Sequence, residues 1–337
     1  MSGIDMTWAE WLPLIFVGLL GFTMFVYVVL DGFDLGVGML MHRADATERN
    51  QMVASIGPFW DANETWLVLG IGLLLIAFPK ANTIISTALY LPIMFMLIGL
   101  ILRGVAFDFR VKAREQHQLW WNWAFIFGSG LASVMQGYML GRYVTGFAEG
   151  LQFWLFALAI AVAVPATYTL IGACWLIIKT EGELQEKAIG WAKLAWWPVV
   201  IGMLLISLAS PWVSPLVFDK WFKLPEIFAL AFIPLITGGA LLLMRWYFNQ
   251  PDLLRGRRSW VPFALMMLSL FMGAVGLAYS MFPYVVIGQL TAWDAASSTE
   301  ALTIILIGAL VTVPMIIAYS LFAFWIFRGK VRDLTYG

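Results

Sequence analysis

Residues 57–79 have the sequence GPFWDANETWLVLGIGLLLIAFP, an apolar run that is long enough to cross a bilayer and yet carries Asp61 and Glu64. A second apolar run, VYVVLDGFDLGVGML, carries Asp31 and Asp34. An acid inside a lipid-spanning helix costs roughly 3 kcal/mol unless it faces a partner, water or an ion path. Four such acids in the first two apolar runs therefore indicate a place where protons or cations are handled.

The composition of the whole chain agrees with a membrane protein. Of its 337 residues, 62% are hydrophobic and only 12% are charged, with a mean hydropathy of +0.86. A soluble domain carries about 25% charged residues. We therefore expect an all-α, polytopic membrane protein. The net charge is zero and no charge block is long enough to suggest nucleic-acid binding, and the N-terminus has no basic residue of the kind that opens a signal peptide.

Nine apolar segments approach the roughly 20 residues that a spanning helix needs. We expect a single transmembrane domain, residues 1–337, with spans at about 11–41, 52–78, 81–107, 120–140, 151–178, 191–209, 226–246, 260–282 and 301–327. Prolines inside membrane helices are tolerated but kink some of them. The prolines inside these spans include Pro58, Pro92, Pro165, Pro234 and Pro314.

The basic residues predict the orientation of the chain. Fifteen of the twenty lie in the connections after spans 1, 3, 5 and 7 and in the C-terminal tail, including Arg332, whereas four lie in the alternate connections. Because basic residues accumulate on the cytoplasmic side, this distribution places the N-terminus outside, in the periplasm, and the C-terminus in the cytoplasm. The alternation also favours an odd number of spans.

The acids are predicted to form a series that is graded in depth. Counted along ideal helices, Asp108 and Asp34 lie at the cytoplasmic boundary, Asp31 slightly inside, Asp61 deeper and Glu64 near the middle of the membrane. Such a series resembles a half-channel that takes protons from the cytoplasm and stops part-way. A purely structural role of single acids remains the alternative, for example pairing with an arginine or capping a broken helix.

Three further residues have less specific interpretations. Arg103 lies inside a span and is expected to be an ion-pair partner rather than a substrate ligand. Gly32 and Gly36 form a GxxxG pattern, which favours close helix packing, with a cofactor site as the minor alternative. Asp294 lies in an outer connection and is expected to serve as a turn or cap residue.

Cysteine and histidine usage limits the cofactors that the chain can hold. The one cysteine, Cys174, excludes an internal disulfide and a cysteine-based metal or iron–sulfur site. His42 and His117 lie in polar connections, which excludes bis-histidine haem within the bilayer. This chain therefore offers no obvious consumer of the protons.

Five motifs together make the chain recognisable. In order and spacing over nearly its full length, it resembles subunit II of the cytochrome bd-type quinol oxidases. Its short connections resemble the cyanide-insensitive branch that is found in proteobacteria. The motifs are VLDGFDLGVGML, GPFWDANETW, RGVAFDFR (103–110), SMFPYV (280–285) and LTAWDAASS (290–298).

The resemblance implies a heterodimer in the bacterial inner membrane. The larger partner, subunit I, would carry haems b558, b595 and d and the quinol site, and the complex would oxidise quinol and reduce O2 to water while building a membrane potential. This chain would bind no catalytic haem but would be needed for assembly. A structural quinone in this subunit and a small single-span accessory subunit are left open, and lipids would fill the interface. The family's two four-helix bundles plus one peripheral helix would match nine spans.

The resemblance also implies roles for the acids. Asp108 would take up protons at the cytoplasmic side, Asp61 would relay them deeper, and Asp31 and Asp34 would contribute. Glu64 is expected at a position where the family often has a neutral amide. Two rival hypotheses remain: a stand-alone proton-coupled secondary transporter, which would need acids accessible from both sides and usually inverted repeats, and a scaffolding subunit whose acids are silent.

Overall fold

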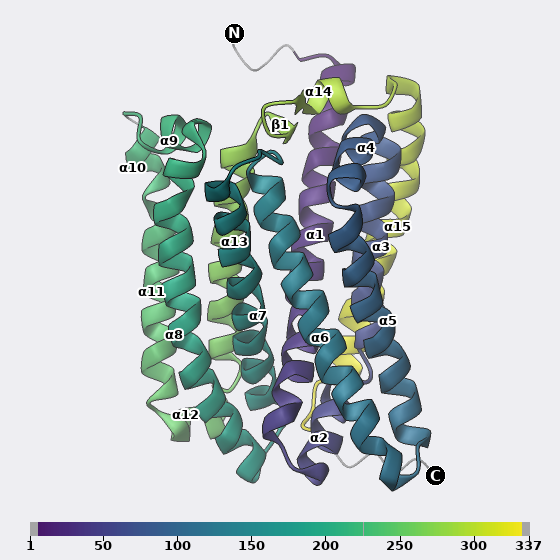
Figure 1. Cartoon of the computed structure of the whole chain (residues 1–337), viewed down its shortest axis with the longest axis vertical. Helices are drawn as coiled ribbons and strands as arrows, with labels where there is room; N and C mark the ends of the chain where they lie inside the picture. Colours follow the sequence, from purple (N-terminus) through teal and green to yellow (C-terminus); the bar gives the residue numbers. More distant parts are fainter. Residues whose placement is uncertain (1–5, 225, 332–337) are drawn as a thin grey trace.

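The first apolar run forms one long helix, α1 (Trp8–Leu40), which contacts α3, α6 and α7 in the middle of the bundle (Figure 1). The computed structural model describes residues 6–224 and 226–331. The ends of the predicted domain 1–337, including Arg332, lie outside the described residues. The expected all-α class is confirmed, because helices make up nearly all of the secondary structure.

Eighteen helices and strands follow one another along the described residues. In order they are α1, η1 (Met41–Arg43), α2 (Ala46–Ile56), α3 (Trp60–Ala77), α4 (Pro79–Ala88), α5 (Tyr90–Lys112), α6 (Glu115–Val144), α7 (Leu151–Lys179), α8 (Gly182–Val213), α9 (Pro215–Trp221), α10 (Glu226–Leu230), α11 (Phe232–Phe248), α12 (Pro251–Arg255), α13 (Val261–Met281), β1 (Tyr284–Val286), β2 (Leu290–Thr291), α14 (Ala292–Ala295) and α15 (Thr299–Ile326).

Three of the predicted spans are interrupted, and a proline lies at or near each interruption. Span 52–78 breaks around Pro58, between α2 and α3, and span 81–107 breaks at Leu89, between α4 and α5. Span 226–246 breaks at Ala231. Proline has no N–H for the carbonyl four residues before it. Pro92 and Pro234 therefore cannot donate to the carbonyls of residues 88 and 230. Each of these carbonyls lies directly before a break, at Leu89 or Ala231. Pro165 and Pro314, in contrast, lie inside continuous helices.

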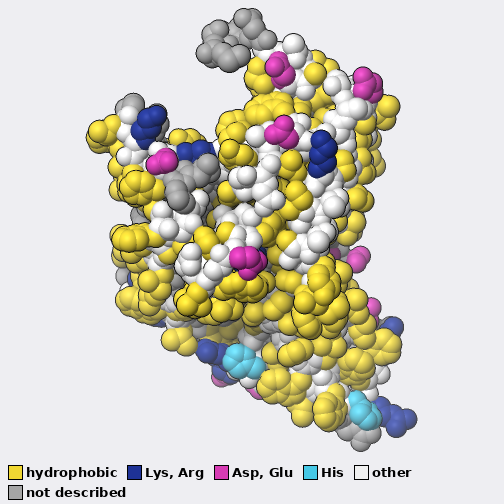
Figure 2. Space-filling model, turned by 45° about the horizontal axis from the view of Figure 1, so that its top comes forward, with side chains coloured by type: hydrophobic (Ala, Val, Ile, Leu, Met, Phe, Trp, Pro, Cys, Tyr) yellow, Lys and Arg dark blue, Asp and Glu magenta, His cyan; other side chains and the backbone are white. Residues whose placement is uncertain are grey.

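Seven helices are long and apolar enough to cross a membrane among the described residues: α1 extended to Arg43, α3, α5, α7, α8, α13 and α15. The helices α6 and α11 lie beside them in Figure 1 but are not among these seven. Hydrophobic side chains cover most of the face in Figure 2. Many large hydrophobic side chains of the chain are exposed, including Trp212 at 90%, as expected for surfaces in contact with lipid or a partner.

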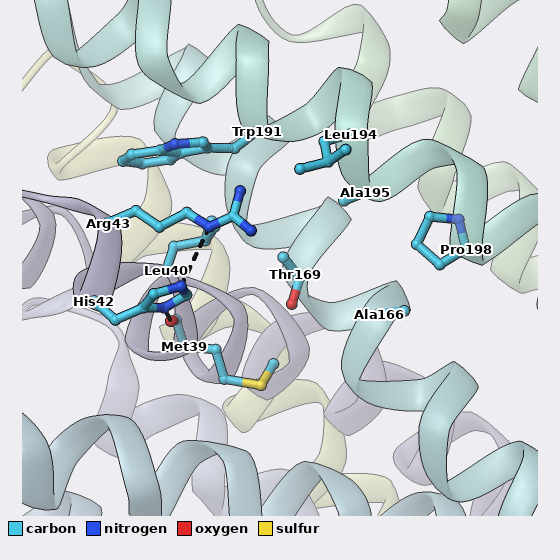
Figure 3. Close-up of a pocket in the computed structure, with 10 residues that line it drawn as sticks. All are labelled: Met39, Leu40, His42, Arg43, Ala166, Thr169, Trp191, Leu194, Ala195 and Pro198. Carbon is cyan, nitrogen blue, oxygen red and sulfur yellow. Dashed lines mark hydrogen bonds between the residues drawn. The ribbon is translucent and has the colours of Figure 1, made fainter.

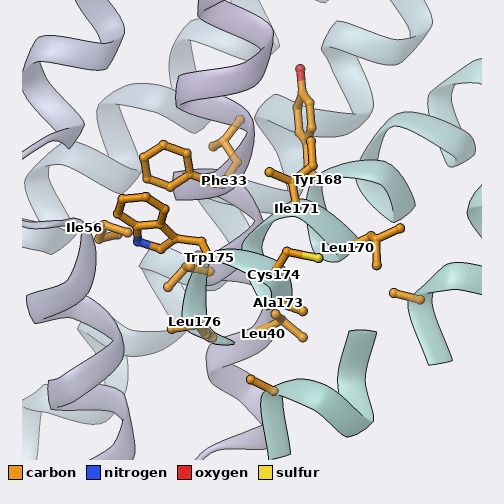
Figure 4. Close-up of a cluster of buried hydrophobic side chains, with 14 of the residues drawn as sticks. Phe33, Leu40, Ile56, Tyr168, Leu170, Ile171, Ala173, Cys174, Trp175 and Leu176 are labelled. Atoms are coloured by element: carbon orange, nitrogen blue, oxygen red, sulfur yellow. The ribbon is translucent and has the colours of Figure 1, made fainter. Parts of the chain in front are cut away.

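An aromatic core joins α1, α3, α7 and α15. Phe33 stacks on Trp175 with ring centroids 4.2 Å apart, and Figure 4 shows the two rings face to face. Phe59 stacks on Phe324 at 4.6 Å, and Trp175 donates its indole N–H to the Ser55 carbonyl at 3.2 Å. Aromatic pairs of this kind add about 1 kcal/mol each beyond their buried area. This core fixes the N-terminal end of α3 against α1.

The two ends of the bundle carry different elements. One end, called the α14 end below, holds the antiparallel β1–β2 pair and α14, while the opposite end, called the α2 end, holds α2 and α12 (Figure 1). The expected cap role of Asp294 is confirmed: its carboxylate accepts from the Thr291 hydroxyl at 2.5 Å, and these hydrogen bonds hold the pKa of Asp294 below its usual range. α1 begins at the α14 end and α15 finishes at the α2 end, so the described chain runs from one side of the bundle to the other.

A reciprocal clasp, made by Lys179 and Lys330, closes the α2 end. The ammonium of Lys179, the last residue of α7, donates to the carbonyls of Phe327 and Gly329, the latter at 3.0 Å. In return Lys330 donates to the Thr180 carbonyl at 2.8 Å, and the Val331 amide donates to the Lys179 carbonyl at 2.8 Å. The segment after α15 is thereby fixed to the end of α7.

Candidate functional site

A buried arginine in the third apolar run pairs with acids of the first two runs. Arg103, on α5, is only 1% exposed. Its Nη1 donates to Asp31 Oδ1 at 2.7 Å and its Nη2 donates to Glu64 Oε1. The guanidinium lies 6.0 Å from the ring centroid of Trp60. Because each carboxylate comes from a different helix, one cation ties α1, α3 and α5 together.

A second polar contact lies beside the arginine. Asp34 is fully buried, and its Oδ2 accepts from Asn63 Nδ2 at 2.8 Å. The same amide nitrogen lies 3.4 Å from the Leu30 carbonyl. Asn63 was not predicted as a site residue. The available signal was its place beside Asp61 and Glu64 in an otherwise apolar run.

Three atoms of this buried cluster have no hydrogen-bond partner within the described part of the chain: Asp31 Oδ2, Asp34 Oδ1 and Arg103 Nε. The cluster also contains three carboxyl groups, counting Glu64, against one guanidinium. Burying unpaired charge is costly. The arrangement can therefore take up a proton, because a carboxyl that becomes neutral removes surplus negative charge from the interior.

A short chain of hydrogen bonds lies beside the cluster and joins α1, α6 and α7. Tyr27 lies one turn before Asp31 on the same face of α1. The Tyr27 hydroxyl accepts from Gln136 Nε2 at 2.7 Å, and the Tyr168 hydroxyl donates to Gln136 Oε1 at 2.7 Å. Sequence reasoning did not find these three polar residues. Only the four-residue spacing of Tyr27 from Asp31 could have indicated one of them.

The two glycines of the GxxxG pattern lie where α1 meets α7. A Cβ atom at Gly32 would lie 2.9 Å from the ring of Tyr168, and one at Gly36 would lie 1.8 Å from the Tyr168 carbonyl oxygen. On α7, a Cβ at Gly172 would lie 2.5 Å from the Gly36 carbonyl carbon. The two backbones therefore touch, and this contact holds Tyr168 in place for its bond to Gln136.

The other two predicted acids lie apart from this buried cluster. Asp61, in the first turn of α3, and Asp108, near the end of α5, are both exposed in this chain. Asp61 lies one turn before Glu64, whose side chain is 27% exposed and reaches from the surface to the arginine. Two residues after Asp108, Arg110 donates from Nη2 to Asn50 Oδ1 at 2.7 Å and from Nε to Asn122 Oδ1 at 2.5 Å.

The expected order of depth is changed by the break at Pro58. Counted from residue 52, Glu64 was expected well inside the membrane and deeper than Asp31. The helix α3 begins only at Trp60, however, so Glu64 lies near its first turn. Since Arg103 contacts both Asp31 and Glu64, these two acids lie at the same level.

Comparison with known proteins identifies the family. The family described as "Cytochrome bd terminal oxidase subunit II" matches residues 12–327. The chain belongs to this family. Curated relatives agree with the assignment: the chain is 28% identical to cytochrome bd ubiquinol oxidase subunit 2 of Bacillus subtilis (strain 168), with 100% of both chains covered. It is also 28% identical to cytochrome bd-I ubiquinol oxidase subunit 2 of Escherichia coli (strain K12), with 93% of both covered.

A solved structure shows the same fold. A chain of the bd oxidase from Geobacillus thermodenitrificans superposes with a TM-score of 0.75, at 19% identity, over 94% of this chain and 99% of that one. The resemblance to cytochrome bd subunit II that the motifs carried is thereby confirmed, and the chain is part of a haem-bearing quinol oxidase complex. The assignment to the cyanide-insensitive branch stays a prediction.

The residues that could hold a metal are few. Across residues 6–224 and 226–331, no group of three or more His, Cys, Asp or Glu side chains has a geometry that would hold a metal ion. His42 and His117 are exposed at the α2 end, and Cys174 is buried among apolar side chains. The polar groups that this site offers are carboxyl groups and tyrosine hydroxyls, which can exchange protons, and amide side chains, which hydrogen-bond to them.

Proposed function

We propose that this subunit conducts protons from the cytoplasm to the haem-bearing subunit I, where quinol oxidation would drive the reduction of O2 to water. The observation that carries the proposal is the division of the acids between an exposed pair and a buried cluster. Asp108 and Asp61 are open on α5 and α3, while Asp31 and Asp34 are enclosed behind Arg103.

The proposed order of transfer begins at the exposed acids and ends at the buried ones. Asp108, near the end of α5, receives protons from the cytoplasm, and Asp61 receives them next. Glu64 then connects the surface with the interior, because it lies one turn from Asp61 and bonds to Arg103. Asp31 and Asp34 act as the store behind this connection.

Charge balance supports a store of protons in the cluster. One guanidinium faces three carboxyl groups, of which Asp31 and Asp34 are buried and Glu64 is partly exposed, so a carboxyl of this cluster that holds a proton lowers the surplus of negative charge. Such a group can release its proton when a partner group becomes negative and regain it from the next donor. The hydrogen-bonded chain of Tyr27, Gln136 and Tyr168 gives Asp31 polar neighbours on the side of α6 and α7.

The wider arrangement is proposed on the same basis. Nine spans, arranged as two four-helix bundles plus one peripheral helix, would include α6 and α11 with the seven helices above. An odd number of crossings agrees with the described chain running from one side of the bundle to the other. The basic residues favour a cytoplasmic α2 end. Subunit I would carry haems b558, b595 and d, and this chain would be required for its assembly.

The rival transporter hypothesis is not favoured. It needs acids that are reachable from both sides of the membrane, whereas the acids of the cluster and the exposed pair all lie on α1, α3 and α5. The curated relatives are oxidase subunits, and none of those reported above is a transporter. The scaffolding hypothesis remains as an outcome that the following experiment can detect.

Replacing Asp61 by asparagine tests the proton path. The amide preserves shape but cannot carry a proton through a carboxylate. We expect Asp61→Asn to slow O2 consumption at saturating quinol roughly tenfold or more. The haem content of the purified complex should stay near that of wild type, because Asp61 has no hydrogen bond or ion pair within the described residues to lose.

The control is Asp252→Asn, which changes an exposed aspartate on α12 at the same end of the bundle. It should leave the rate unchanged. Full turnover of the Asp61 variant would contradict the relay. Loss of haem with the rate per haem preserved would assign Asp61 to assembly instead and support the scaffolding hypothesis.

A further inference from the structure

A cavity of about 250 Å³ lies at the α2 end, between the end of α1, η1, α7 and α8. Its polar side is formed by His42 and Arg43, and its apolar side includes Ala166, Ala195 and Pro198 (Figure 3). It lies outside the acid cluster, and nothing in the proposed proton path uses it. The inference rests on the proposed function in one respect, the cytoplasmic placement of the α2 end.

The hydrogen bonds of His42 fix the direction of Arg43. His42 Nδ1 lies 2.6 Å from the Met39 carbonyl oxygen, and because a carbonyl only accepts, Nδ1 is the protonated nitrogen. His42 Nε2 is then free to accept from Arg43 Nε at 3.2 Å. One side of the guanidinium is thus occupied by a neutral ring.

The other side of the guanidinium is available to a ligand. Its two terminal amino groups have no hydrogen-bond or ion-pair partner among the residues that the structure describes. Figure 3 shows Arg43 between the ring of His42 and that of Trp191, with its terminal nitrogens directed toward the cavity. Two parallel N–H donors suit a phosphate or carboxylate oxygen pair.

The apolar side of the cavity opens along the outer surface of α8. Leu194 lines the cavity and is 57% exposed, and Trp197 and Ile201 continue the same stripe at 53% and 51% exposure. Their spacing of three and four residues keeps them on one face of the helix. Leu204 and Leu208 extend the stripe at 58% and 68% exposure, so an anion in the cavity would lie at the head of an apolar path of about 20 Å, at 1.5 Å per residue.

We propose that this cavity binds the phosphate of an anionic phospholipid, with Arg43 holding the phosphate oxygens and the α8 stripe contacting an acyl chain. Basic pockets between membrane helices on the cytoplasmic side bind anionic head groups in this way. A free phosphate would use only the polar side, so the apolar stripe favours the lipid. His42 acts as a positioning residue through its bond to Arg43.

The test uses the oxidase complex, purified through a tag on this chain and stripped of loosely held lipid. Wild type and Arg43→Gln are mixed with micelles containing phosphatidylglycerol or phosphatidylcholine, and retained lipid is counted by native mass spectrometry. We expect wild type to retain phosphatidylglycerol roughly tenfold more than the variant, the effect of losing one charge-assisted contact. Phosphatidylcholine should be retained weakly by both.

A matched control is Arg328→Gln, because Arg328 also lies next to a tryptophan, Trp325, at 5.5 Å, but does not line the cavity. It should bind as wild type does. Ala166→Leu fills the cavity while keeping the charge, and it should also lose the lipid, which keeps the test valid if the arginine variant fails to assemble. Unchanged retention in Arg43→Gln or in Ala166→Leu would overturn the proposal, as would displacement of the lipid by millimolar inorganic phosphate, which would indicate a free-anion site.

Discussion

At the scale of single residues, Arg103 has the largest consequences. It is buried, and it pairs with carboxylates from two other helices. The sequence predicted an ion-pair role for it from its position inside a span. Its two partners could not be assigned, because helix rotation and the break at Pro58 decide which acids reach it.

Arg103→Gln should destabilise the subunit by about 3–5 kcal/mol, because it leaves the buried Asp31 and the partly buried Glu64 without a counter-charge. Unfolding of the purified complex in mixed micelles, followed with haem content, measures the effect. The double variant Asp31→Asn/Arg103→Gln should recover part of the loss, since it removes one of the orphaned charges. Equal stability of Arg103→Gln and wild type would show that the pairs contribute nothing.

At the scale of elements, proline positions account for only part of the difference between the predicted spans and the observed helices. The apolar runs located every long helix, but the breaks at Leu89 and Ala231 lie three residues before Pro92 and Pro234. Pro165 lies in an unbroken helix, so proline alone does not decide the outcome. The packing of neighbouring helices decides it, and that information is not local to the sequence.

The contact between α1 and α7 gives a sharp test of helix packing. Gly36→Ala would place a methyl group 1.8 Å from the Tyr168 carbonyl oxygen, so the two helices must move apart. We expect a loss of about 2 kcal/mol or more in the free energy of unfolding. Gly18→Ala, on the same helix with nothing within 4 Å, should change it by less than about 0.5 kcal/mol. Similar values for both variants would argue against close packing at Gly36.

At the scale of the whole molecule, the question is which end of the bundle, the α14 end or the α2 end, faces the cytoplasm. Sequence reasoning derived the orientation from basic residues alone, because charge asymmetry is a property of the whole chain. The expected depths of the acids were less reliable, since they were counted along unbroken helices. The break between α2 and α3 interrupts the span along which the depth of Glu64 was counted.

Cysteine labelling can test the orientation directly. The native Cys174 is fully buried, so background labelling should be low. A membrane-impermeant maleimide should label Arg257→Cys, at the α2 end, only in inverted vesicles. It should label Glu300→Cys, at the start of α15, only in right-side-out vesicles. The reverse pattern would invert the topology, and labelling of both from one side would rule out an odd number of crossings between them.

The reciprocal lysine clasp has a consequence for biosynthesis. Lys179 is translated about midway through the chain. Its carbonyl acceptors belong to Phe327 and Gly329, which are translated about 150 residues later. Until those residues leave the ribosome, the ammonium of Lys179 and the end of α7 lack their final partners. A prematurely terminated chain would keep this defect permanently and offer it to the proteases that remove unfinished membrane proteins.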